Sequence, residues 1–186
     1  MQGIFSNLYL VLQSKLSAIS GIRFVAEDTG QLFDDQPAVL FPCIFINIDN
    51  VQFSNIAENC QMGMVYVVLK LVCDVYSDSS GNTPLSSKEK GLNYLAIESQ
   101  IHQVIQGYSP SSDAVPVVSP EAQPTGWADV FGAFDRVSAV TNKQRPDLRI
   151  RELTYSLGFE DYSTANIITY APATLSFTDT IVITEL

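Results

Sequence analysis

The 186-residue chain has few of the residues from which enzymes and metal sites are usually built. It holds one histidine, His102, and three cysteines, Cys43, Cys60 and Cys73, with no C-x-x-C pair. One histidine and three unpaired cysteines are too few to predict a zinc site or a disulfide framework. We expect Cys43 and Cys73 to be buried small hydrophobic residues. Phosphate-binding glycine loops, G-x-S-x-G and H-E-x-x-H are also absent, so we predict no enzymatic activity, no metal and no cofactor.

Positive charge is scarce as well. Ten lysines and arginines stand against twenty aspartates and glutamates, which gives a net charge of −10. Nucleic-acid affinity comes mainly from clustered basic side chains, so this charge disfavours a sequence-reading DNA binder. The same sign of charge would suit a surface past which DNA slides without adhering.

Long hydrophobic runs are missing, although 46% of the residues are hydrophobic. No stretch approaches the roughly 20 apolar residues of a membrane span. The start of the chain lacks the basic region and cleavage site of a signal peptide, so we expect no export. The surplus apolar surface is therefore expected to meet partner subunits rather than lipid.

The clearest positive signal is the alternation of apolar residues from Met64 to Tyr76. A period of two sustained over this length predicts a strand. Both of its faces are apolar, which places it at the centre of a sheet, with a helix on one side and another subunit or layer on the other. The segment 51–53 and a turn at 61–63 lead into this strand.

Two amphipathic helices are predicted, one from Ile4 to Ile19 and one opened by a capping box at 86–89 and closed by Gly107. Strands are predicted at 22–26, 38–48, 127–140, 148–159 and 175–184, with exposed loops at 27–36 and 77–86. Pro42 marks a sheet edge, a bulge or the true start of its strand. A Pro/Ser-rich loop occupies about 109–126. The order predicts one α+β domain over 1–186, with a largely antiparallel or mixed sheet and both helices on one face.

The sharpest enzymatic candidate is the tripeptide Asp28-Thr29-Gly30, which aspartic proteases also carry. Those enzymes share a proton between two aspartates, and a dimer could supply the second carboxylate. Here Ala26-Glu27 precede the tripeptide and Gln31 follows it, which favours a solvated acidic loop. Asp28, Asp34 and Asp35 also lack the spacing of a calcium loop.

The order of features resembles the tail-terminator or tail-completion proteins of tailed bacteriophages and prophages. The first half carries the resemblance in the N-terminal helix, the acidic turn 27–32, the strand 41–46 and the long strand that ends Leu71-Val72-Cys73-Asp74. The second half carries it in the capped helix, the segment 131–136 and the strand 149–155 followed by Gly158-Phe159-Glu160-Asp161.

This resemblance implies a structural virion protein of the neck, assembled in the cytoplasm of the bacterial host. Such a protein forms a homo-oligomeric ring, usually a hexamer, that caps the tail tube and joins it to the head connector, while DNA passes without specific binding. Another neck component, such as a head–tail adaptor or stopper, remains the alternative. A hydrolase built on Asp28 is the second alternative.

Two sets of residues are candidates for that function. The first is a subunit interface, in which Trp127 is either the anchor or a residue of a satellite core. Its members are Trp127, Val130, Phe131 and Phe134. The second is an acidic loop that either faces a DNA channel or only aids solubility. Its members are Glu27, Asp28, Asp34 and Asp35.

Overall fold

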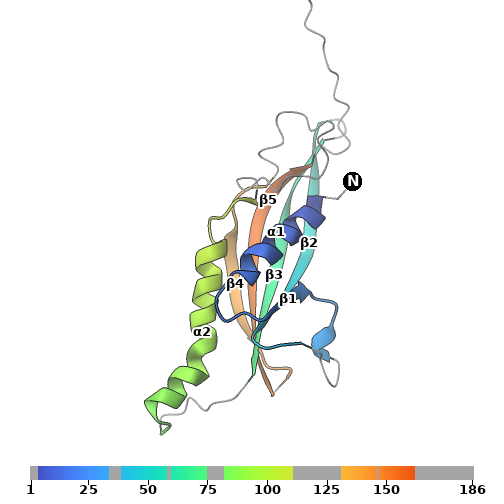
Figure 1. Cartoon of the computed structure of the whole chain (residues 1–186). Coiled ribbons are helices and arrows are strands. Elements are labelled where there is room, and N and C mark those ends of the chain that lie inside the picture. The colour runs from blue at the N-terminus through green and yellow to red at the C-terminus, as the bar shows by residue number, and fades with distance from the viewer. Residues whose placement is uncertain are drawn as a thin grey trace, which may run out of the picture.

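The computed structural model describes residues 4–33, 39–57, 60–74, 82–110, 131–145 and 147–161 (Figure 1). Two helices and a short 3₁₀ turn accompany the strands. In chain order the elements are α1 (Ile4–Ser17), β1 (Phe24–Glu27), η1 (Gln31–Phe33), β2 (Cys43–Ala57), β3 (Cys60–Asp74), α2 (Leu85–Ile105), β4 (Asp135–Asn142) and β5 (Leu148–Asp161).

The five strands form one mixed sheet in the order β1-β2-β3-β5-β4. β1 runs parallel to β2, and the other neighbouring pairs are antiparallel. β3 lies at the centre, as its two apolar faces predict. The α+β class with a largely antiparallel sheet is therefore confirmed.

Both helices pack on the same face of the sheet, which we call the covered face. From α1, Leu8, Leu12 and Leu16 are fully buried, at the i, i+4 spacing that places them on one stripe. α2 contributes Ile97, Ile101 and Ile105 at the same spacing. They meet strand side chains of one parity in a single core, namely Val65, Val67, Leu69, Leu71, Leu153, Tyr155, Leu157 and Phe159.

Glycines with left-handed backbone follow both helices. Gly21 has a φ of 93° and Gly107 a φ of 73°, a region in which a side chain is strained. The N–H of Gly107 donates to the carbonyl of Phe134 at 2.8 Å, so the end of α2 is tied to the segment that enters β4. The predicted ends of both helices are confirmed.

The opposite face, which we call the open face, has a smaller core at one end. Leu32 of η1 packs there against strand residues of the other parity. The buried members of this second cluster are Leu32, Cys43, Phe45, Val72, Leu148 and Ile150. The turn after β1 thus covers only the part of the open face where β1 and β2 begin.

Two local predictions are wrong. The segments 51–53 and 61–63 are not a lead-in and a turn, because Phe53 pairs with Gly63 and Ser54 with Met62 inside one long β2–β3 hairpin. Gly63 is needed there because a Cβ would lie 2.8 Å from the ring of Phe159 and would collide with the Gln52 carbonyl. The capping box is also wrong, since α2 starts at Leu85 behind Pro84, with no side-chain cap.

The choice left open at Pro42 is resolved, because β2 begins at Cys43 directly after it. Most of the Pro/Ser-rich loop, from 111 to 126, and the predicted strand at 175–184 lie outside the described residues. Within the described part of the chain, neither helix has the length and apolar character needed to cross a bilayer.

Candidate functional site

The half of the open face beyond the second cluster carries apolar side chains on its surface. Met62 and Met64 of β3 are 45% and 43% exposed. Tyr66 and Val68 continue the β3 row and are half-buried. We call these four residues the open-face patch.

Strand register explains why these residues share one side of the sheet. Along β3 they alternate with Val65 and Val67, which are buried under the helices. The neighbouring residues on the same face are polar, since Gln52 and Ser54 of β2 lie opposite Met64 and Met62. No described element packs over this part of the sheet (Figure 1). An exposed apolar row with a polar rim is typical of a protein–protein contact.

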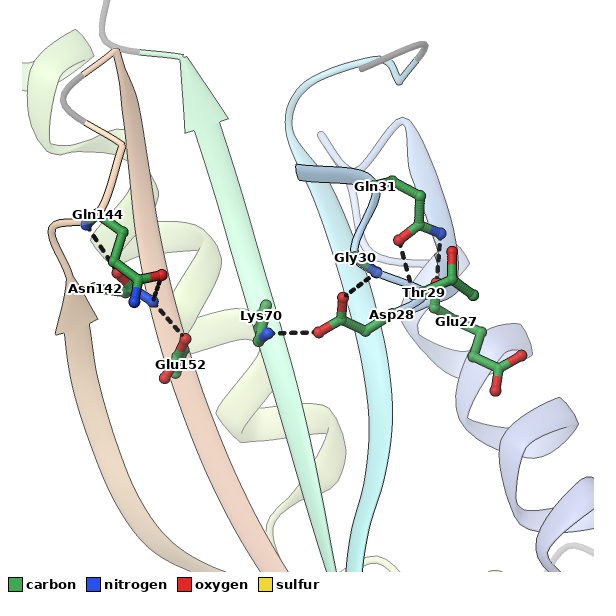
Figure 2. A network of polar contacts seen from close by, with 9 residues as sticks. All are labelled: Glu27, Asp28, Thr29, Gly30, Gln31, Lys70, Asn142, Gln144 and Glu152. Carbon is green, nitrogen blue, oxygen red and sulfur yellow. Dashed lines mark hydrogen bonds and ion pairs between the residues drawn. The ribbon is translucent and has the colours of Figure 1, made fainter. Parts of the chain in front are cut away.

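At the other end of the open face the acidic turn forms a closed polar network (Figure 2). The carboxylate of Asp28 holds the ammonium of Lys70 at 2.5 Å and accepts the N–H of Gly30 at 3.2 Å. The amide of Gln31 donates to the carbonyl of Glu27 and accepts the N–H of Thr29. These bonds fix the turn over the second cluster.

A second polar group faces the first across β3 and β5. Glu152 accepts a hydrogen bond from the amide of Asn142 at 2.8 Å. Arg145 pairs with Asp147 at 2.8 Å and donates to the carbonyl of Leu32. The hydrogen bond from Arg145 lowers the pKa of the Asp147 carboxyl. Both groups line one recess, whose polar atoms are engaged with one another.

This geometry argues against the hydrolase built on Asp28. In an aspartic dyad two carboxylates share one proton, whereas here a lysine ammonium holds one oxygen of Asp28 and a backbone N–H holds the other. Glu152 lines the same recess but bonds to Asn142. Among the described residues, no three His, Cys, Asp or Glu side chains gather as metal ligands. The tripeptide therefore acts as a turn that anchors a loop.

The acidic loop is less uniform than the sequence suggests. Glu27 is exposed at the end of β1, whereas the side chain of Asp28 is only 8% exposed and its charge is balanced by Lys70. Asp34 and Asp35 lie outside the described residues. Whether this loop faces a channel stays a prediction.

The predicted interface segment before β4 also lies only partly within the described residues. Phe131 bridges to Phe159, and Phe134 is fully buried against Tyr155 and beside Tyr108. Both side chains lie inside the subunit and are not available as surface contacts. Trp127 and Val130 lie outside the described residues, so their role at an interface stays a prediction.

Sequence reasoning predicted that the second apolar face of β3 meets another subunit or layer, but it did not single out the residues of the open-face patch. The alternation that identified β3 also listed Met64, Tyr66 and Val68 on its second apolar face. What the pattern could not supply was the position of η1, whose coverage stops before these residues. Which half of that face stays exposed follows only from the position of η1 in the fold.

Comparisons with known proteins give little further guidance. No protein-family model and no curated protein matches the sequence. Among solved structures, 24 chains match. One is a chain from a structure described as the virion of a native gene transfer agent particle, which has 11% identity and a TM-score of 0.40. The match covers 81% of this chain and 85% of that one.

Proposed function

We propose that this chain is a structural virion protein of the neck, a tail-terminator or tail-completion subunit that forms a ring on the tail tube and joins it to the head connector. The observation that carries the proposal is the one-sided cover of the sheet. Two helices bury one face, while the open-face patch leaves Met62 and Met64 available for a neighbouring subunit. A ring is closed by head-to-tail contacts, so each copy must present one such surface to a complementary surface of its neighbour.

Two sequence features support this function over other oligomers. The order of features resembles tail-terminator and tail-completion proteins along most of the chain. The net charge of −10 also suits a subunit beside which DNA moves, because an acidic surface does not trap phosphate groups. A hexamer is the ring size that the resemblance implies.

The first test is the mass and shape of the purified protein, by light scattering and negative-stain imaging. We expect a closed ring. Replacing Met62 and Met64 together by lysine should shift the particle to monomer, because burying two ammonium groups at a subunit contact is costly. The fold should survive, since both side chains are exposed.

A matched control places the same two charges on the outer side of α2. Gln100 and Gln103 are exposed there, and their double lysine variant should still form rings. A monomeric wild-type protein, or rings that persist in the Met62/Met64 variant, would contradict the proposal.

The neck position needs a separate test, because a head–tail adaptor or stopper would also form a ring. Purified rings are incubated with isolated tail tubes and, separately, with isolated head connectors. A terminator should bind the end of a bare tail tube. Binding to connectors but not to tubes would favour the adaptor.

A further inference from the structure

The first half of α2 extends beyond the core of its own subunit. Between residues 85 and 96 only Gly91 is buried, whereas Ile97, Ile101 and Ile105 of the second half pack in the main core. The first turns of the helix lead away from the sheet (Figure 1). This half of α2 therefore has an outer side that no described element covers.

Apolar side chains gather on that outer side. Leu85 is 72% exposed, Leu92 43% and Leu95 42%, and Ala96 is exposed beside them. Spacings of three, four and seven residues place these four on one side of a helix, and we call them the helix stripe. The other helix differs, because the exposed positions of α1 are three serines and one leucine, namely Ser6, Leu10, Ser14 and Ser17.

The helix stripe and the open-face patch match in length and chemistry. Between its end residues the stripe rises about 17 Å along the helix, and the patch extends about 20 Å along β3. On the covered face the same sheet already packs against apolar helix sides. We propose that the helix stripe of one copy packs on the open-face patch of a neighbouring copy. This inference rests on the proposed function and identifies the two surfaces that form each contact of the ring.

The position of the two surfaces makes the contact intermolecular. α2 lies on the covered face, and Arg149, near the start of β5, donates to the carbonyl of Gly91. The patch lies on the other face, where Met62 is opposite Glu160 near the end of β5. A stripe therefore cannot contact the patch of its own subunit. Contacts between two different surfaces are head-to-tail, which is the arrangement that generates rings.

The charges beside the two surfaces are complementary as well. Among the strand residues that lie opposite the patch residues, Asp49 and Glu160 are acidic and none is basic. The first half of α2 carries Lys88 and Lys90 against one carboxylate, that of Glu89. Opposite charges around an apolar contact favour the correct partner. A net positive segment in a chain of net charge −10 thus suits a second copy as the occupant of the patch.

The first test removes the stripe from the full-length protein. Replacing Leu92 and Leu95 together by lysine should convert rings to monomers in light scattering, because two ammonium groups would have to be buried on the patch. The control is the lysine variant of Gln100 and Gln103, which lie beyond the stripe and should leave rings intact. Circular dichroism and urea midpoints check the fold. If the lysine pair lowers the midpoint, Leu92→Gln with Leu95→Gln replaces it, since glutamine is a good helix former.

The second test mixes two variants that are each monomeric. The lysine variant of Met62 and Met64 keeps its stripe, and the lysine variant of Leu92 and Leu95 keeps its patch. Their equimolar mixture should contain a particle of twice the monomer mass, because one stripe meets one patch while the two remaining surfaces carry lysines. Light scattering over a range of protein concentrations, with each variant alone as the control, measures this mass.

Three results would overturn the inference. They are rings that persist in the folded stripe variant, a mixture no heavier than the two variants alone at every concentration, and dimers formed by the stripe variant by itself, since the last would mean that patch packs on patch. A monomeric wild type overturns the proposed function and the inference together. Wild-type rings that survive the loss of the stripe overturn the inference alone.

Discussion

The two faces of the sheet are held by different kinds of contact. On the covered face, long helices bury a continuous apolar core and one charged network. Within that network, Glu98, only 8% exposed, receives two hydrogen bonds from Arg151, at 2.8 and 3.0 Å. On the open face, a short turn covers one end through Asp28 and Lys70 and leaves the other end bare. The covered face therefore holds the larger buried core, whereas the open face is buried only at the end that the second cluster occupies.

The largest effect should come from the covered face of β3. Leu69→Ala removes a fully buried side chain from the centre of the sheet and should lower the free energy of unfolding by about 3 kcal/mol. Met64→Ala on the same strand, 43% exposed on the open face, should cost less than about 1 kcal/mol. Urea denaturation measures both. Equal losses of unfolding free energy in the two variants would contradict the difference between the two faces.

The next largest effect concerns the charged network between α2 and the sheet. Glu98→Ala leaves the guanidinium of Arg151 poorly solvated, with Arg136 at 3.9 Å from the lost carboxylate. We expect a loss of about 2 kcal/mol by urea denaturation. Glu89→Ala, exposed on the same helix, is the control and should change stability by less than about 0.5 kcal/mol. A silent Glu98 variant would show that packing alone holds α2.

Alkaline pH should lower the free energy of unfolding through buried groups on both faces. Burial raises the pKa of Tyr155 on the covered face to about 12 and that of Cys43 on the open face to about 12. Unfolded, these groups ionise near pH 10 and 9. Above those values the unfolded chain has lost protons that the native protein keeps, so stability falls as the pH rises.

Tyr155→Phe isolates the contribution of the covered face. The hydroxyl of Tyr155 is buried and has no hydrogen-bond partner among the described residues, so its removal should be nearly neutral at pH 7. Between pH 10 and 12 the variant should lose about 1 to 2 kcal/mol less than the wild type. Urea midpoints at pH 7, 10 and 11 provide the measurement. An unchanged alkaline slope would assign the loss to the cysteines.

The smallest effect is expected at the turn on the open face. Asp28→Asn weakens the pair with Lys70, whose side chain is 22% exposed, and should cost about 1 kcal/mol. The exposed residue Asp49 gives the control variant Asp49→Asn, which should be neutral. A double-mutant cycle with Lys70→Gln isolates the coupling energy. If Asp28→Asn is silent, other contacts hold the turn in place.

The sequence predicted the elements whose evidence is local. Leu8, Leu12 and Leu16 mark one helical stripe, and Leu153 and Tyr155 mark one face of a strand, so composition and period alone place them. Both helices on one face followed from the order of these elements, and the structure agrees.

The rest depended on contacts between distant residues. From the sequence Gly63 looks like a turn residue, but it lies inside a strand. A glycine is required there because the ring of Phe159, from a later strand, occupies the space that a side chain would fill. Asp28 could not be paired with Lys70 before the sheet was assembled. Phe131 and Phe134 belong to the core because Phe159 and Tyr155 reach them from a later strand.

The position of β3 at the centre of the sheet also affects how the protein is made. Its neighbour on one side, β2, directly precedes it in the sequence. Its neighbour on the other side is β5, so Gln61 cannot pair until Asp161 has been synthesised. During synthesis, one edge of an apolar strand stays unpaired until α2 and β4 have also emerged. A chain that stops before Leu148 would carry that edge permanently and should aggregate by strand pairing. The late position of β5 in the sequence therefore sets how long this edge of β3 stays exposed during synthesis.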